Sequence, residues 1–133
     1  MVLNEMAAEA LAARGFEDLR PALLAVGQHI GEGGSRITEL AERAMLTKAT
    51  VVYIVNELEQ LGYVTRRPDP ADGRAKLVVA TDRARRAEAA ARDALVEIRA
   101  AWAELVGPEN LATLEAELRR LRAALWPSEP GAG

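Results

Sequence analysis

The sequence lacks cysteine and contains one histidine and five aromatic residues among its 133 residues. Without cysteine there is no disulfide, thiolate metal site or thiol redox chemistry, and one histidine cannot build a histidine-rich metal site. No paired nucleophile and base can be assembled from what remains, so we expect no enzymatic activity, no cofactor and no metal. With so few aromatic residues, the core must consist mainly of alanine, leucine and valine.

Long apolar runs are also lacking. No stretch approaches the ~20 apolar residues of a membrane helix, and there is no signal-peptide pattern. These absences predict a soluble, cytoplasmic protein with no membrane partner. Apolar residues nevertheless make up 50% of the sequence, which is enough for the core of a single domain over residues 1–133.

The net charge of −3 is unevenly distributed along the chain. Residues 35–86 contain ten basic and seven acidic residues, a net charge of +3, whereas the remainder carries −6. A basic central segment between acidic flanks favours a nucleic-acid partner for the centre of the chain.

That central segment begins with the pattern of two short helices. Thr38 and Thr47 are suitable N-caps, and Gly62 is suited to end the second helix. Apolar residues of the second helix recur at spacings of three and four, which predicts one buried face and an opposite polar face. This pattern indicates a helix-turn-helix, although it also fits an ordinary helical hairpin of a small α-protein. The apolar positions are Val51, Ile54, Val55, Leu58 and Leu61.

A β-hairpin follows the second helix. Its predicted strands are residues 64–67 and 75–80, with a turn rich in proline, aspartate and glycine over residues 68–73. Period-two alternation predicts that Val64, Leu77 and Val79 point inward, and that Arg66, Lys76 and the loop residue Arg74 point outward. A helix-turn-helix followed by such a hairpin is a winged helix, whose second helix enters the major groove of DNA.

These residues resemble the MarR family of bacterial transcription regulators. The resemblance is specific at the end of the second helix, where an LE-x-x-G pattern is present as Leu58, Glu59 and Gly62, and at the hairpin, where a D-x-R pattern is present as Asp72 to Arg74. It implies a homodimeric repressor or activator whose DNA affinity is lowered by a small, commonly aromatic or acidic, effector. It also implies that Asp72 supports the wing by holding a nearby arginine.

The expected fold is mainly α, a winged helix-turn-helix with flanking N- and C-terminal dimerisation helices and a two-stranded β wing. Within this single MarR-like domain we expect dimerisation helices at residues 1–17 and 82–126, the winged helix at 18–81, and a disordered tail at 127–133. The N-terminal part reads as two helices, one ended by Gly15 and one running from Pro21 to the glycines at 31–34.

The C-terminal part predicts a helix from Asp82 to Val106 and, after Gly107, a last helix with an uninterrupted leucine seam. Such a seam must be buried. We expect a second copy of the chain to cover it, which would place two recognition helices ~34 Å apart on a palindrome. The alternative is a monomer whose first and last helices pack together. The seam consists of Leu111, Leu114, Leu118, Leu121 and Leu125.

The predicted DNA-binding residues lie on the second helix and the wing. We expect Asn56 to bind adenine and Thr50 to contact a base edge or phosphate in the major groove, with Arg74 in the minor groove. Glu57 would repel the DNA backbone or pair with Arg66 or Arg67. The full set comprises Lys48, Ala49, Thr50, Tyr53, Asn56, Arg66, Arg74 and Lys76, of which Arg66 and Lys76 would contact phosphates.

An effector pocket is expected where the dimerisation helices meet the winged helix. Leu24, His29 and Trp102 are its candidate residues, with Leu23, Ile30 and Leu95 also at its walls. His29 alternatively is a surface histidine near a helix end. The predicted function is a sequence-specific DNA-binding transcription regulator, a repressor acting as a homodimer on double-stranded DNA with a palindromic operator. The alternative is a winged-helix module for protein contacts.

Overall fold

The computed structural model describes residues 2–125, with side chains from residue 4 onward. It divides the chain into two compact units, residues 1–94 and 95–133. The predicted tail at 127–133 and the predicted end of the last helix at 126 lie outside the described residues. No helix within the described part is both long and apolar enough to cross a membrane.

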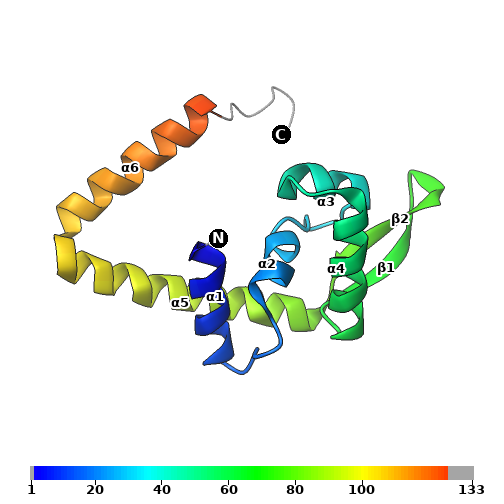
Figure 1. The fold of residues 1–133 in the computed structure, drawn as a ribbon, viewed down its shortest axis with the longest axis horizontal. Coiled ribbons are helices and arrows are strands. Elements are labelled where there is room, and N and C mark those ends of the chain that lie inside the picture. The colour runs from blue at the N-terminus through cyan, green and yellow to red at the C-terminus, as the bar shows by residue number, and fades with distance from the viewer. Residues whose placement is uncertain (1, 126–133) are drawn as a thin grey trace. The chain divides into compact units, whose positions relative to one another are not determined.

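The first unit begins with four helices, α1 (Val2–Ala12), α2 (Pro21–Gly27), α3 (Ile37–Ala44) and α4 (Lys48–Gln60), as Figure 1 shows. Pro21 occupies the first turn of α2, as predicted, but α2 ends one turn early because residues 28–30 form tighter turns. Thr47 caps α4 by accepting a hydrogen bond from the Thr50 amide at 3.2 Å, which confirms the predicted start. The predicted cap at Thr38 is wrong. Arg36 occupies that position, and its amide donates to Glu39 Oε1 at 3.3 Å.

The core of this unit is built on the predicted face of α4. Val51, Ile54, Val55 and Leu58 are buried, and α4 packs against α2, α3 and the first strand. Gly62 follows α4 with φ of 83°, a conformation that costs glycine little, so it ends the helix as predicted. The periodic pattern of α4 therefore identified its buried side correctly.

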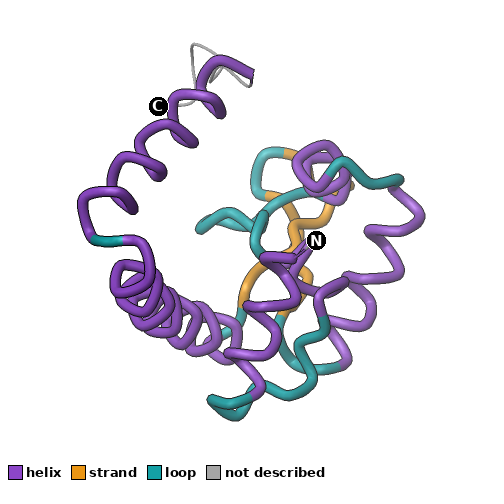
Figure 2. Tube along the Cα trace, turned by 60° about the vertical axis from the view of Figure 1, so that its left-hand side comes forward, coloured by secondary structure: helices purple, strands orange, loops and turns teal. Residues whose placement is uncertain are grey.

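The wing consists of β1 (Val64–Asp69) and β2 (Asp72–Ala80), paired antiparallel. The predicted six-residue turn is too long, since Pro70 and Ala71 alone separate the strands. Arg74 consequently lies in β2 rather than in a loop. Figure 2 shows the hairpin as the two orange strands beside the helices of this unit.

The predicted alternation in β2 is wrong by one residue. Val78 is buried, with 1% of its surface exposed, whereas Leu77 and Val79 are half-buried. A register irregularity between Pro68 and Asp69 shifts the return strand, so that Arg66 pairs with Val78. Cross-strand partners share a face, so Arg66 lies on the inward face with Val64, contrary to prediction.

A third short segment is added to the wing from the loop before α3. Ser35 and Val78 exchange two backbone hydrogen bonds of 3.0 and 2.8 Å. The neighbouring Gly34 has φ of 94°, and a Cβ atom there would lie 3.0 Å from Val79 Cγ2 and 3.1 Å from Leu77 Cβ. The glycine-rich loop thus allows the backbone to approach β2 closely.

The last two helices are α5 (Asp82–Val106) and α6 (Pro108–Leu125), with the predicted starts and with Gly107 between them. The first half of α5 contributes Ala87 to the core of the first unit. In the second unit, Arg99 and Glu115 form two hydrogen bonds of 2.8 Å between α5 and α6. Leu111 is buried, but the other four leucines of the predicted seam are exposed.

Candidate nucleic-acid interface

The predicted recognition surface of α4 is accessible. Lys48, Ala49, Thr50 and Asn56 are exposed, and Tyr53 is 70% exposed. The hydroxyls of Thr47 and Thr50 lie 2.8 Å apart, so the cap holds Thr50 at the start of this surface. The structure therefore places all five residues where a ligand can reach them, and their contact with DNA remains a prediction.

A basic groove lies between α4, the start of α3 and the wing. Arg36, Lys48, Arg66 and Lys76 line it, together with Thr38, Val52 and Val78 among others, and its volume is about 360 Å³. Lys48 comes from the first turn of α4 and Lys76 from near the wing tip, so the hairpin runs alongside α4 (Figure 1). Four cations around one groove can attract phosphate oxygens.

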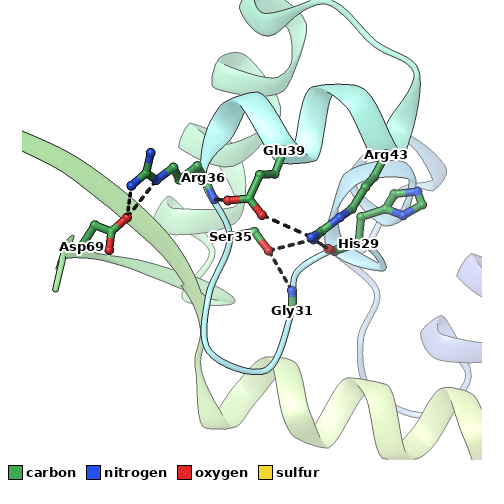
Figure 3. A network of polar contacts seen from close by, with 7 residues as sticks. All are labelled: His29, Gly31, Ser35, Arg36, Glu39, Arg43 and Asp69. Atoms are coloured by element: carbon green, nitrogen blue, oxygen red, sulfur yellow. Dashed lines mark hydrogen bonds and ion pairs between the residues drawn. The ribbon is translucent and has the colours of Figure 1, made fainter. Parts of the chain in front are cut away.

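Arg36 fixes the wing to the start of α3. Its Nε and a terminal nitrogen donate to Asp69 Oδ2 at 2.8 and 2.5 Å, as Figure 3 shows. The other carboxylate oxygen accepts from the Ala71 amide at 2.9 Å. Asp69 is only 8% exposed, and these two donors, the amide first, lower the pKa of its carboxyl. The same ion pair raises the pKa of Arg36. The charged pair is therefore intact at neutral pH.

Sequence reasoning missed Arg36 and Asp69 and assigned the arginine-holding role to Asp72. In the structure, Asp72 Oδ1 accepts from the backbone amide of Arg74 at 3.1 Å, and the wing aspartate that accepts from the Arg36 guanidinium is Asp69. An aspartate at the start of a tight turn is a visible signal. Its partner 33 residues earlier is not visible in the sequence.

Arg43 continues this polar network toward α2. It donates to the His29 backbone oxygen at 3.0 Å, to Ser35 Oγ at 3.1 Å and to Glu39 at 3.2 Å (Figure 3). Ser35 Oγ accepts in addition from the Gly31 amide at 2.9 Å. Burial, followed by the charge of Arg43, lowers the pKa of the His29 imidazole. The hydrogen bond from Arg43 to the backbone oxygen of His29 links the loop after α2 to α3.

Two side chains of α4 have partners that the sequence did not predict. Glu57 pairs with Arg20, at the start of α2, and not with Arg66 or Arg67. Arg66 instead donates to Asn56 Oδ1, and its Nε lies 3.8 Å from Glu59 Oε2. The inward-facing register of Arg66 accounts for this difference, because it brings the guanidinium onto α4.

An apolar cavity of about 270 Å³ lies in the first unit. Leu23, Leu24 and Ile30 line it, whereas His29 is not among the lining residues, and the binding of an effector there stays a prediction. Leu95 and Trp102 belong to the second unit, so their part in a ligand site remains a prediction. The walls also include Leu11, Leu19, Leu58, Tyr63, Val64 and Ala87.

Tyr63 joins this cavity to a second polar cluster. Its hydroxyl donates to Asp18 Oδ1 at 2.5 Å, and Arg83 lies over its ring, 4.3 Å from the centroid. Arg83 also donates to Asp18 Oδ2 at 2.9 Å. Burial, together with the bond to Asp18, raises the pKa of the Tyr63 phenol well above its usual range. Tyr63 therefore stays neutral and a hydrogen-bond donor.

Comparison with known proteins agrees with this architecture. Residues 21–75, from the start of α2 into β2, match the model of the MarR family. Over this segment the chain is similar to the MarR family. A search of the curated proteins found no match. The observed fold, mainly α with a winged helix-turn-helix and a two-stranded wing, is that of MarR-family transcription regulators, as predicted.

Three solved structures illustrate the similarity of this chain to known proteins. Transcriptional regulator Tm0710 from Thermotoga maritima is 27% identical, with 90% of this chain and 85% of that chain covered and a TM-score of 0.64. CouR from Rhodococcus jostii RHA1, bound to p-coumaroyl-CoA, is 26% identical over 92% and 83%, with a TM-score of 0.65. Sco3205, a MarR family transcriptional regulator from Streptomyces coelicolor in complex with DNA, is 26% identical over 99% and 85%, with a TM-score of 0.61.

Metal binding has no support in the described part of the chain. Within residues 2–125, no group of three or more histidine, aspartate or glutamate residues is arranged to hold a metal ion.

Proposed function

We propose that this protein is a sequence-specific DNA-binding repressor in which α4 enters the major groove and the wing contacts the adjacent minor groove. The observation that carries the proposal is the exposed polar face of α4 beside the groove of four cations. The structure of Sco3205 in complex with DNA supports the same use of this fold. Lys48, Ala49, Thr50, Tyr53 and Asn56 would face the bases, with Arg66, Lys76 and the wing residue Arg74 on the backbone or in the minor groove.

The proposed regulator acts as a homodimer on a palindromic operator. The four exposed leucines of α6 support this part of the proposal, because an apolar seam of this length is stable in water only when it is covered. We assign dimerisation to α1 and to α5 and α6, and DNA binding to residues 18–81. A two-fold axis would present two copies of α4 to successive major-groove segments.

A small aromatic or acidic effector would release the repressor from its operator. The apolar cavity that Leu24 and Tyr63 line supports such a ligand, and the structure of CouR with p-coumaroyl-CoA shows a similar protein with a bound acyl-CoA. The proposal places this regulator in the cytoplasm, where its operator would be.

The test is binding to duplexes selected from a random DNA pool, measured by gel shift over a range of salt concentrations. Arg74→Ala should weaken binding by about tenfold or more, while Arg122→Ala on α6, with the same loss of charge, should not. A log–log plot of affinity against salt should be steep, because each neutralised phosphate releases counterions. Absence of any salt-dependent duplex binding would instead favour a protein-contact module.

A further inference from the structure

Arg66 bridges the wing and the recognition helix in a way that the proposed DNA contacts do not explain. It lies on the inward face of β1, opposite Val78, and is half-buried. One terminal nitrogen donates to Asn56 Oδ1, and Nε lies 3.8 Å from Glu59 Oε2. Among the described residues the buried Nε has no hydrogen-bond partner. The ion pair with Glu59 partly offsets the cost of burying this N–H group. The guanidinium is thus held against α4 by two side chains one helical turn apart.

This contact determines which way the Asn56 amide faces. A guanidinium has five N–H donors and no acceptor, so only the carbonyl oxygen of the amide can face Arg66. The NH2 group must then point the other way. Asn56 is exposed on the recognition face of α4, so this NH2 group is the half of the amide offered to a ligand.

The orientation limits which bases the side chain can read. An asparagine that binds adenine in two places accepts a hydrogen bond from N6 and donates one to N7. Arg66 engages one of the two lone pairs of the Asn56 oxygen and holds that oxygen on the side of the wing, so the side of the amide that faces away from Arg66 offers only N–H donors. In the major groove guanine presents two acceptors, N7 and O6, and thymine presents O4, whereas cytosine presents only a donor.

We propose that Arg66 is a specificity-determining residue that acts through Asn56, making the amide select an acceptor edge, guanine above all, in place of adenine. The inference rests on the proposed function and replaces two of its contacts: the adenine contact that the sequence alone predicts for Asn56 and the phosphate contact predicted for Arg66. Arg66 positions Asn56, and Glu59 positions Arg66. Its role therefore differs from that of Lys76, whose expected contact is with a phosphate and carries no sequence information.

The experiment compares base preferences of the full chain and four variants on duplexes selected by the wild type, each with single base-pair changes. Asn56→Ala identifies the position that Asn56 reads, because preference there should disappear. At that position the wild type should prefer guanine to adenine by about tenfold. Arg66→Lys keeps a donor-only group and should retain the preference. Arg66→Met keeps the length but loses the donors, so the amide can turn and adenine should become the preferred base.

Lys76→Met is the matched control, since it removes a cation from the same groove. It should weaken binding to all duplexes equally and leave the preference unchanged. Thermal unfolding verifies that Arg66→Met is folded, and Arg66→Leu, which also lacks donors, provides the same test should the methionine variant not fold.

The outcomes separate this inference from the function on which it rests. A wild-type preference for adenine at the Asn56 position would overturn the inference and leave DNA binding intact. So would an unchanged guanine preference in the folded Arg66→Met or Arg66→Leu variant. Failure of the wild type to bind any selected duplex would overturn the proposed function and this inference together.

Discussion

Helices α4 and α6 carry nearly the same apolar repeat but differ in what covers it. On α4, residues at spacings of three and four are 0–6% exposed, whereas four of the five leucines at such spacings on α6 are 54–58% exposed. The spacing therefore identifies the side of a helix that requires burial, and the rest of the chain determines whether that burial occurs. The first unit buries the apolar face of α4 within itself, whereas the apolar face of α6 in the second unit requires another surface to cover it.

Truncation on the covered side should have the largest effect. Leu58 is 1% exposed in the core of the first unit, so Leu58→Ala should lower the free energy of unfolding by about 2–5 kcal/mol through lost burial and a residual cavity. Urea unfolding measures this loss. Val52→Ala, on the exposed side of the same helix, should cost less than ~0.5 kcal/mol. Equal losses from both variants would contradict the assignment of the two faces.

A charge on the uncovered seam should act on association instead of folding. Leu118→Asp should raise the dimer dissociation constant by roughly tenfold or more, because a carboxylate in an apolar interface loses its hydration. Sedimentation equilibrium reports the change. Ala116→Asp adds the same charge on the opposite side of α6 and should leave association unaltered. A wild-type chain that stays monomeric at high concentration would remove the dimer from the proposal.

A smaller effect is expected at the Arg20–Glu57 ion pair, which links the start of α2 to α4. The pair is solvent-exposed, so Arg20→Ala should leave stability almost unchanged. It would release the Glu57 carboxylate beside the DNA phosphates, and duplex affinity should fall about twofold to fivefold, the range of a ~0.5–1 kcal/mol charge effect. The double variant Arg20→Ala/Glu57→Ala should restore affinity. A gel shift that shows no restoration would mean that Arg20 itself contacts DNA.

The smallest effect concerns His29 and the dependence of stability on pH. Burial and the nearby Arg43 lower the pKa of folded His29 below its ordinary value of 6.5, so the unfolded chain binds this proton more readily. The contribution to unfolding free energy is therefore constant above that value and becomes less favourable to folding as pH drops below it. Urea unfolding at pH 7.5 and 5.5 should show a smaller loss of stability in His29→Gln than in the wild type. An equal loss of stability in the wild type and in His29→Gln would contradict the lowered pKa of His29 in the folded chain.

Local chemistry was sufficient to predict much of the fold and the accessibility of the site. The cap at Thr47, the stop at Gly62 and the break at Gly107 act on residues within one turn, so the sequence alone locates them. The exposed face of α4 follows in the same way from its repeat. The sequence pattern was weaker at the start of α3 and in β2. There it predicted Thr38 in place of Arg36 as the cap, and Leu77 and Val79 in place of Val78 as the inward-facing residues. The resemblance to the MarR family was confirmed by the match over residues 21–75.

Only the tertiary structure determined which polar and charged side chains pair with one another. Arg36 lies 33 residues from Asp69, Arg20 lies 37 residues from Glu57, and Arg66 meets Asn56 from the inward face of β1, opposite Val78. Capping and periodicity extend over a few residues, whereas these pairings depend on how the wing and the helices pack against one another. A sequence therefore shows that arginines and carboxylates are present, and packing selects their partners because a guanidinium can reach any of several acids that the chain brings close.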